Sequence, residues 1–121
     1  MGKVRSTGNK STELKLIKIL RQSNIKGWRR NQALPGRPDF IFRSRRVVIF
    51  VDGCFWHGCP LCYRRPKSNQ AFWDEKVRKN KKRDETVNRE LREKGWNVVR
   101  IWEHELKDPD SVAQRVFDAL R

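Results

Sequence analysis

One stretch of sixteen residues, VVIFVDGCFWHGCPLC at positions 47–62, constrains the fold of this chain more than any other. Its first part is an unbroken run of β-branched and aromatic residues, from which we expect a strand over residues 46–51. A strand without polar positions is typical of the centre of a sheet whose two faces are both covered. The run stops at Asp52 and Gly53, so the cysteines, the histidine and the aromatic pair that follow are delivered to one end of that sheet.

Apolar spacing, helix caps and turn residues place the other expected elements. Ser11 supplies a hydroxyl cap and Glu13 an acid in the first helical turn. The sequence Pro35-Gly36-Arg37-Pro38 indicates a tight turn, and Gly95 marks the end of a long helix. The segment 28–34 is ambiguous between strand and loop. We expect helices over residues 11–22, 71–94 and 109–120, and strands over residues 39–42, 46–51 and 96–102. This order, α-β-β-α-β-α, predicts an α/β fold with a mixed sheet flanked by helices.

The length and the N-terminal composition indicate a single domain preceded by a short arm. A chain of 121 residues is long enough for one core but not for two. Residues 1–10 are basic and contain Gly, Ser and Asn. We therefore expect a flexible basic arm over residues 1–10, which lies against phosphates, and a single domain over residues 11–121.

The charge balance points to a polyanionic partner, first of all nucleic acid. Lys and Arg number 29 against 14 Asp and Glu, which gives a formal net charge of +15. A merely soluble basic surface explains less, because five Trp and six Phe accompany the charge. An acidic membrane surface is disfavoured, since the basic helices are not strongly amphipathic. No stretch approaches the roughly 20 apolar residues of a membrane span, and the first residues lack the apolar core of a signal peptide, so we expect a cytoplasmic protein.

Three cysteines within nine residues indicate a metal site. Cys54, Cys59 and Cys62 have the spacing C-x4-C-x2-C, and the last pair has a common zinc-binding spacing. The fourth ligand is either His57, which lies between the cysteines, or His104, which would tie a remote segment to the loop. The alternative is a set of ordinary reduced thiols. An odd number of cysteines argues against a disulfide framework.

Carboxylates and an imidazole near the expected strand ends suggest a hydrolytic site. Asp39 begins one strand and Asp52 ends its neighbour, so both carboxylates can converge at one edge. Two carboxylates and a main-chain carbonyl are good ligands for Mg²⁺, which stabilises charge on a phosphate and lowers the pKa of an attacking water. If His104 binds zinc, His57 is left to activate that water. Each carboxylate alone has a simpler interpretation as a turn residue or a cap.

The long expected helix carries a stripe in which polar residues interrupt apolar ones: Trp73, Val77, Asn80, Asp84, Val87 and Leu91. A buried polar group without partners costs roughly 1–3 kcal/mol. Asn80 and Asp84 therefore either lie where water reaches them or point into a polar site next to residues 52–57. Lys76 and Arg83 flank the same face and suit anions.

Phe55 and Trp56 lie in the cysteine loop, with no alternating pattern that would bury them. One interpretation is that they stack on bases or wedge between base pairs. The other is that they form a small core around the metal. Trp96 and Trp102, on an expected strand, are interpreted as core residues.

Four motifs, PGRPDFIF, VVIFVDGCFWHGC, FWDEKVRKNKKRD and GWNVVRIWEHEL, resemble in this order those of the very-short-patch-repair (Vsr) mismatch endonucleases. The resemblance covers roughly residues 11–106. It implies a restriction-endonuclease-like fold with a structural zinc site. It also implies a Mg²⁺-dependent nick in duplex DNA, 5′ to the mispaired thymine of a T:G mismatch that arises when 5-methylcytosine deaminates. A link to general mismatch repair proteins is implied as well.

Carried over by position, the resemblance implies roles for individual residues. Asp39 and the carbonyl of Val51 would bind Mg²⁺, and His57 would help to activate water. Glu13 and Asp84 would reach the site from their helices. The implied zinc ligands are Cys54, Cys59, Cys62 and His104, and the implied DNA-wedging aromatic residues are Phe55, Trp56 and Trp73.

Two departures from the family pattern affect the site. Val51 and Asp52 stand where the best-known pattern has Thr-His, so one catalytic imidazole is absent and His57 is the remaining candidate base. A carbonyl ligand survives the change from Thr to Val, and Asp52 would add a metal-binding carboxylate. The cysteine loop is one residue shorter, with Cys59 where a histidine ligand is often found.

The sequence therefore predicts a zinc-stabilised, Mg²⁺-dependent DNA endonuclease, expected as a monomer, that nicks mismatched duplex DNA. Asp39, Asp52 and His57 would carry out the hydrolysis. Lys76, Asn80 and Arg83 would contact DNA beside the aromatic residues. The alternatives are a non-catalytic zinc-containing DNA-binding module and a restriction-type endonuclease that cuts paired DNA.

Overall fold

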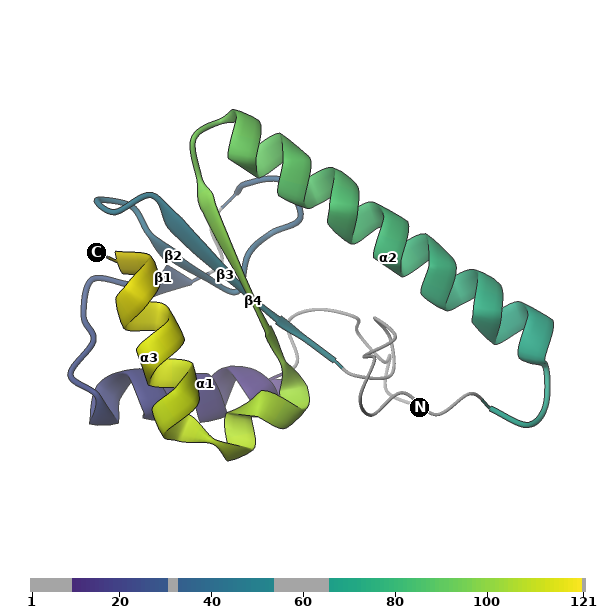
Figure 1. The fold of residues 1–121 in the computed structure, drawn as a ribbon, viewed down its shortest axis with the longest axis horizontal. Helices are drawn as coiled ribbons and strands as arrows, with labels where there is room; N and C mark the ends of the chain where they lie inside the picture. The colour runs from purple at the N-terminus through teal and green to yellow at the C-terminus, as the bar shows by residue number, and fades with distance from the viewer. Residues whose placement is uncertain (1–9, 31–32, 54–65, 121) are drawn as a thin grey trace.

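The computed structural model describes residues 10–30, 33–53 and 66–120, and in this part helices pack on a four-stranded sheet (Figure 1). The helices are α1 (Lys10–Gln22), α2 (Gln70–Glu93) and α3 (Pro109–Leu120), with a short 3₁₀ helix, η1 (Glu103–Lys107). The strands are β1 (Arg29–Arg30), β2 (Phe40–Phe42), β3 (Val47–Asp52) and β4 (Asn97–Trp102). The predicted order of elements is confirmed, and the ambiguous segment 28–34 contributes the short strand β1.

The sheet has the order β1-β2-β3-β4 and mixes both strand directions. β2 is antiparallel to β1 and to β3, whereas β3 and β4 are parallel, with Val47 opposite Asn97 and Asp52 opposite Trp102. A parallel pair needs a crossover connection, and α2 lies in that connection. The predicted mixed sheet flanked by helices is confirmed, and β3 is a central strand in which every residue is buried.

Different helices cover the two faces of the sheet, α1 and α3 on one side and α2 on the other (Figure 1). Successive side chains of a strand point to opposite faces, so β3 contributes to both cores. Val47, Ile49 and Val51 join the cluster formed with α1 and α3. Val48 and Phe50 join the cluster formed with α2. The prediction that this strand is covered on both faces is therefore confirmed.

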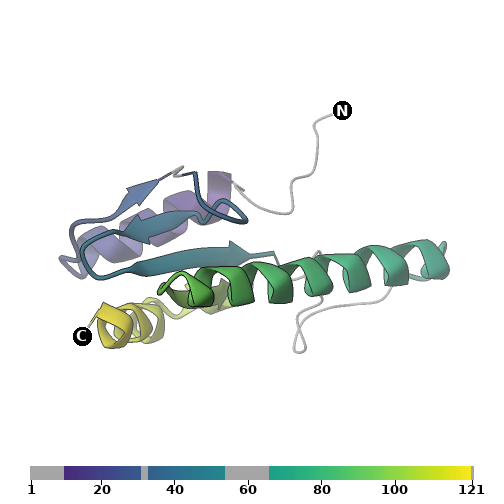
Figure 2. The same ribbon diagram turned by 90° about the horizontal axis from the view of Figure 1, so that it is seen from above.

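The crossover helix α2 has 24 residues, and its N-terminal part extends beyond the strands (Figure 2). Its C-terminal end is where the sequence predicts it. The amide of Gly95 donates to the carbonyl of Arg92 at 3.0 Å, and the amide of Trp96 donates to the carbonyl of Leu91 at 3.0 Å. Within the described ranges, neither α2 nor another helix combines the length and the apolar character needed to cross a membrane.

The predicted turn at residues 35–38 is confirmed and packs against α2. The amide of Arg37 donates to the carbonyl of Leu34 at 2.9 Å, and Gly36 has φ +73°, which glycine adopts without steric strain. A Cβ atom on Gly36 would lie 2.6 Å from Cγ1 of Val87. This close approach fixes the turn on the helix and directs the chain into Asp39 and β2.

The starts of the other two helices compare differently with prediction. α1 begins at Lys10, so Ser11 lies inside the helix and the prediction that it forms the N-cap is wrong. Glu13 remains in the first turn. α3 begins at Pro109 as predicted, and Asp108 caps it by accepting a hydrogen bond from the amide of Ser111 at 3.3 Å.

Candidate active site at the end of the central strands

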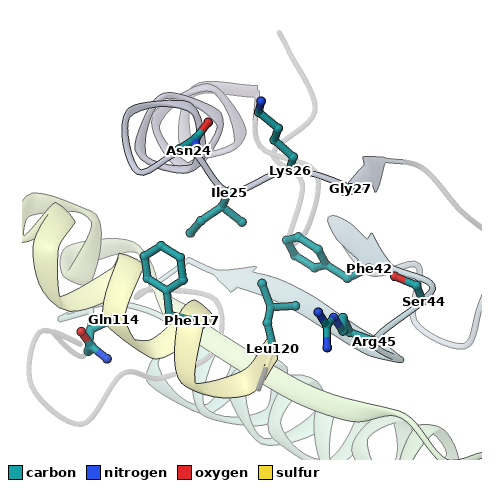
Figure 3. A pocket seen from close by; sticks show the side chains of 10 residues that line it. All are labelled: Asn24, Ile25, Lys26, Gly27, Phe42, Ser44, Arg45, Gln114, Phe117 and Leu120. Atoms are coloured by element: carbon teal, nitrogen blue, oxygen red, sulfur yellow. The ribbon is translucent and has the colours of Figure 1, made fainter.

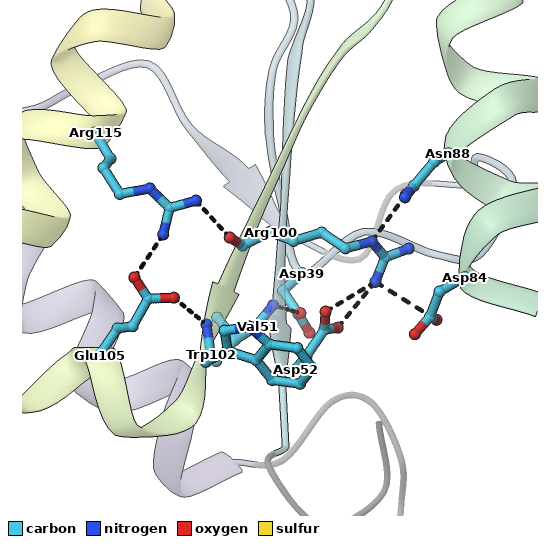
Figure 4. A network of polar contacts seen from close by, with 9 residues as sticks. All are labelled: Asp39, Val51, Asp52, Asp84, Asn88, Arg100, Trp102, Glu105 and Arg115. Atoms are coloured by element: carbon cyan, nitrogen blue, oxygen red, sulfur yellow. Dashed lines mark hydrogen bonds and ion pairs between the residues drawn. The ribbon is translucent and has the colours of Figure 1, made fainter. Parts of the chain in front are cut away.

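Asp39 places a buried carboxylate beside the end of β3. The residue is only 4% exposed, and its Oδ2 accepts a hydrogen bond of 2.7 Å from the amide of Val51 (Figure 4). The turn at residues 35–38 and the first residue of β2 hold the Asp39 backbone on either side. A hydrogen bond from a backbone amide to a carboxylate is stronger than one between neutral groups. Asp39 therefore has a fixed position on the strand that carries Val51 and Asp52.

Asp52 lies at the same end of β3 and is paired with an arginine of β4. The residue is 2% exposed, and its two carboxylate oxygens accept hydrogen bonds from Nη1 of Arg100 at 2.9 and 3.2 Å. Sequence reasoning predicted that the carboxylates of Asp39 and Asp52 converge at one edge. The structure brings Asp39, Val51 and Asp52 together at one end of β3 and adds a cation that the sequence reasoning did not include.

Arg100 connects Asp52 to the crossover helix. Its Nε donates to Oδ1 of Asn88 at 2.8 Å, and its Nη1 lies 3.5 Å from Oδ1 of Asp84. Asn88 and Asp84 are one helical turn apart on α2, and Figure 4 shows both pointing at the guanidinium. The guanidinium also stacks on Phe50, at 4.1 Å from the ring centroid. We call Asp52, Arg100, Asp84 and Asn88 the Arg100 network.

The predicted catalytic residue Glu13 reaches the sheet through a second arginine. Glu13 is 7% exposed, and its Oε2 accepts a hydrogen bond from Nη2 of Arg30 at 3.0 Å. Arg30 is opposite Phe40 in the β1–β2 pair, and Phe40 follows Asp39 directly. The pair therefore attaches the first turn of α1 to the part of the sheet that begins at Asp39.

The polar residues of the α2 stripe have partners in the structure. Asp84 lies in the Arg100 network. It therefore points into a polar site, and water alone does not satisfy its carboxylate. Asn80 is 6% exposed, and its Oδ1 accepts a hydrogen bond from Nη2 of Arg83 at 3.1 Å. Lys76 and Arg83, predicted to contact DNA, are exposed.

The extending part of α2 exposes aromatic surface and a solvated ion pair. Trp73, a predicted DNA contact, is partly exposed and packs edge to face on Phe72 with 5.0 Å between the ring centroids. Phe72 is 60% exposed and was not singled out from the sequence. Close by, Arg78 donates to Glu75 and lowers the pKa of that carboxyl. The charge of Arg78 is therefore already partly neutralised by Glu75.

The predicted zinc site falls mostly outside the described residues. Cys54, Cys59, Cys62, His57, Phe55 and Trp56 all belong to the segment 54–65, so their predicted roles stay predictions. His104 is described, partly buried, in η1 directly after β4. Over the ranges that the structure describes, no three His, Cys, Asp or Glu residues are grouped as metal ligands.

The donors at the end of β3 suit a hard divalent ion only in part. Carboxylate and carbonyl oxygens are the ligands that Mg²⁺ prefers, and Asp39 and Val51 supply both kinds at one place. Asp52 does not fit a ligand role in this arrangement, because both of its oxygens accept hydrogen bonds from Arg100. Asp39 differs from Asp52 in that its Oδ2 accepts a hydrogen bond from a backbone amide, which carries no net charge.

A groove of about 630 Å³ lies elsewhere in the molecule (Figure 3). It is lined by residues 24–27, by Ser44 and Arg45 in the β2–β3 turn, and by Phe117 and Leu120 of α3. The β2–β3 turn precedes β3, whereas Asp52 ends that strand. The groove and the carboxylates therefore lie at opposite ends of the sheet, and the groove is not part of the candidate active site.

Comparison with known proteins gives one matching family and several relatives of this chain. The family described as "DNA mismatch endonuclease Vsr" matches residues 1–64. The chain is 51% identical over 84 residues to the "Type II nicking enzyme V.NaeI" of Lentzea aerocolonigenes, an alignment that covers 69% of this chain and 49% of that protein. It is 42% identical over 89 residues to the "Type II nicking enzyme V.XorIIP" of Xanthomonas oryzae pv. oryzae, covering 72% of this chain and 65% of the relative.

A longer alignment relates the chain to the "DNA mismatch endonuclease Vsr" of Escherichia coli strain K12. It shows 38% identity over 114 residues, 93% of this chain and 72% of that protein. The chain thus spans about half the length of V.NaeI and nearly three quarters of the Escherichia coli protein.

Proposed function

Because the chain belongs to the DNA mismatch endonuclease (Vsr) family, we propose that it is a Mg²⁺-dependent endonuclease that nicks one strand of mismatched duplex DNA. The proposed cut is 5′ to the mispaired thymine of a T:G mismatch. The observation that carries the proposal is the buried carboxylate of Asp39, held by the amide of Val51 at the end of the central strand. The printed names of the relatives, a mismatch endonuclease and nicking enzymes, support the same reaction class. We also propose that the mixed sheet is restriction-endonuclease-like.

The proposed chemistry is hydrolysis of a phosphodiester. Asp39 and the Val51 carbonyl would hold Mg²⁺, which supplies charge stabilisation at the phosphate and a more acidic water. His57 would accept the proton of the attacking water as the water oxygen forms a bond to phosphorus. The phosphorus–oxygen bond to one deoxyribose breaks, its electron pair leaves with the deoxyribose oxygen, and that oxygen takes a proton from solvent. Glu13, held by Arg30, would contribute its carboxylate to the site from the first turn of α1. Because Asp52 is paired with Arg100, we assign the direct chemistry to Asp39 and His57.

The proposed DNA surface lies along α2 and the adjoining loop. The net charge of +15 favours a polyanion. On α2, Lys76 and Arg83 are exposed cations, and the partly exposed Trp73 is a flat aromatic surface that can stack on an unpaired base. We propose that Phe55 and Trp56 wedge beside the mismatch, where weakened stacking lowers the cost of opening a base step. This aromatic wedge would distinguish mismatched from paired DNA.

Replacement of Asp39 tests the hydrolytic assignment. We expect Asp39→Asn to lower the single-turnover nicking rate by at least about 10²-fold, because several kcal/mol of transition-state stabilisation are lost with the carboxylate. Duplex affinity, measured by fluorescence anisotropy without Mg²⁺, should stay unchanged. The exposed Asp110 of α3 provides a matched control, and Asp110→Asn should nick like the wild type.

The choice of substrates separates the proposed reaction from its alternatives. Labelled duplexes that carry T:G, another mismatch or only normal pairs are incubated with and without Mg²⁺. Nicks confined to the T:G duplex and to Mg²⁺ support the proposal. Cuts in both strands of the paired duplex would instead indicate a restriction-type endonuclease, and tight binding without nicks a non-catalytic DNA-binding module. An Asp39→Asn protein that nicks normally would remove the proposed site.

We further propose a structural zinc ion bound by Cys54, Cys59, Cys62 and His104. The position of His104 in η1, directly after β4, suits a ligand that ties the sheet to the cysteine loop. Elemental analysis of the purified protein should find one zinc per chain. His104→Ala should lose the zinc while His57→Ala keeps it. Zinc retained by His104→Ala and lost from His57→Ala would exchange the roles of the two histidines and leave no free imidazole for the chemistry.

A further inference from the structure

Arg100 occupies a position where the strand pattern favours an apolar residue. Its neighbours in β4, Val99 and Ile101, are buried in the core on the α1 and α3 side, and Val98 packs on the α2 side. The Arg100 side chain is 18% exposed, and its Nη2 is buried without a hydrogen-bond acceptor among the described residues. A buried donor without an acceptor is unfavourable, and stacking on Phe50 offsets only part of that loss.

Stability alone does not explain this arginine. Buried ion pairs that are replaced together by apolar residues of similar volume often leave a protein as stable as before, or make it more stable. The Arg100 network is therefore weak evidence for a role in folding. Its position is more informative: the guanidinium holds both oxygens of Asp52, and Asp52 follows Val51, whose amide holds Asp39.

We propose that Arg100 is a positioning residue that links α2 to the end of β3. Through this link, the position of α2 determines where the Asp39 carboxylate lies. This inference rests on the proposed nuclease function. The connection runs from Asn88 and Asp84 on α2 through the guanidinium to Asp52, and then along one peptide to the amide of Val51. Each step is a hydrogen bond, an ion pair or a covalent bond.

The connection has a consequence for substrate recognition. The proposed DNA contacts Trp73, Lys76 and Arg83 belong to the same helix as Asp84 and Asn88. A change in the seating of α2 on the sheet when DNA binds is therefore transmitted to the Asp39 carboxylate through one side chain. A duplex that does not hold α2 in the correct position on the sheet leaves the Asp39 carboxylate misplaced for the reaction. Arg100 thus couples substrate binding to the rate of the chemical step.

Replacement of Arg100 by Met and by Lys tests the inference. Groups that orient catalytic or metal-binding residues typically contribute about 10–100-fold to activity, so we expect Arg100→Met to lower the single-turnover nicking rate by that factor. Arg100→Lys keeps the charge but loses the fork of donors, so it should recover part of the rate. Duplex affinity without Mg²⁺ should equal that of the wild type for both variants. A purely structural role would not separate rate from affinity in this way.

Arg115 provides the matched control. This arginine of α3 also forms an ion pair with a carboxylate, Glu105 at 2.7 Å, and it donates to the carbonyl of Arg100 at 2.6 Å, but on the other side of β4 (Figure 4). Arg115→Met should leave the nicking rate unchanged, even if its melting temperature falls. An equal loss of rate in Arg115→Met and Arg100→Met would reduce the effect to general destabilisation and overturn the inference.

A milder variant keeps the test decisive if Arg100→Met fails to fold. Asn88→Ala removes only the bond to Nε, and we expect a rate loss of roughly threefold to tenfold at unchanged duplex affinity. A wild-type rate in Asn88→Ala would overturn the connection to α2. If Asp39→Asn is inactive while both Arg100→Met and Asn88→Ala nick normally, the inference fails and the proposed function stands. If Asp39→Asn nicks normally, the proposed function fails first.

Discussion

The two faces of the sheet are built in different ways. Among the described residues, the face covered by α1 and α3 buries a cluster of sixteen apolar residues, whereas the face covered by α2 buries a cluster of five. The Arg100 network lies on this second face, between β4 and α2. The chain thus separates a larger apolar cluster, with the Glu13–Arg30 ion pair beside it, from a smaller cluster that borders the Arg100 network.

This difference shows where the molecule can accommodate chemistry. A charged group in a thick apolar core has no access to water and few polar partners, so its burial is costly. On the face covered by α2, Asp52 pairs with Arg100. Arg100 in turn donates a hydrogen bond to Asn88 and forms an ion pair with Asp84 of that helix. We infer that the α1–α3 face carries most of the stability, while the α2 face positions the candidate active site.

Equivalent truncations on the two faces test this division and should give the largest effects. Leu20 on α1 and Leu91 on α2 are both 0% exposed, so the same atoms are removed from each. We expect Leu20→Ala to lower the free energy of unfolding by about 4–5 kcal/mol and Leu91→Ala by about 2–3 kcal/mol, within the range observed for buried leucines. Partly buried Leu34, Trp96 and Val98 surround the α2 cluster and can move into the smaller cavity. Urea unfolding measures both values.

The comparison of the two leucines has a clear opposite outcome. If Leu91→Ala costs as much as Leu20→Ala, the α2 face is packed as rigidly as the other face. The core on the α2 side would then carry an equal share of the stability, and the α1–α3 face would not carry most of it.

Alanine substitutions at two glycines should change the stability less, and they test how tightly α2 packs on the turn at residues 35–38. Gly27 and Gly36 both have positive φ, +91° and +73°, so alanine at either position is strained by about 1–2 kcal/mol. Within the part of the chain that the structure describes, a Cβ on Gly27 meets no atom within 4 Å, whereas one on Gly36 would lie 2.6 Å from the buried side chain of Val87. We expect Gly36→Ala to destabilise the protein by roughly 1 kcal/mol or more beyond Gly27→Ala, because the contact overpacks the α2 face.

Thermal unfolding of the two alanine variants measures this difference directly. Gly27→Ala serves as the control for backbone strain, so the excess in Gly36→Ala reports the steric contact alone. Equal losses would mean that α2 moves away from the turn at little cost, and that its seating on the sheet is looser than the close contact indicates.

Much of the fold could be predicted because its turns and the ends of its elements are determined by local sequence. The apolar run after Arg46, the proline-glycine turn and Gly95 each depend on residues next to them, and all three predictions are confirmed. β1 was harder to predict, because Arg29 and Arg30 have no apolar alternation and pair only through their position opposite Ile41 and Phe40. Strand direction and register likewise depend on distant partners.

The candidate site could be predicted only in part, because its contacts are long-range. Asp39 and Asp52 were identified from their places at strand ends. Arg100 was missed, since its partner Asp52 is 48 residues away in the sequence. A signal did exist: a charged residue in the middle of NVVRIW interrupts an otherwise apolar strand, and such a residue needs a counter-ion when buried. The same reasoning applies to Arg30, the partner of Glu13.

The parallel pairing of β3 and β4 also affects how the chain is made. Val47 and its partner Asn97 are fifty residues apart. On a ribosome that adds roughly 5–20 residues per second, about 3–10 s pass between the synthesis of the two. During that interval β3 can form a hairpin with β2, but its other edge, five apolar residues in a row, has no native strand to bind. The growing chain, more than the finished protein, is therefore the form most exposed to pairing with foreign strands.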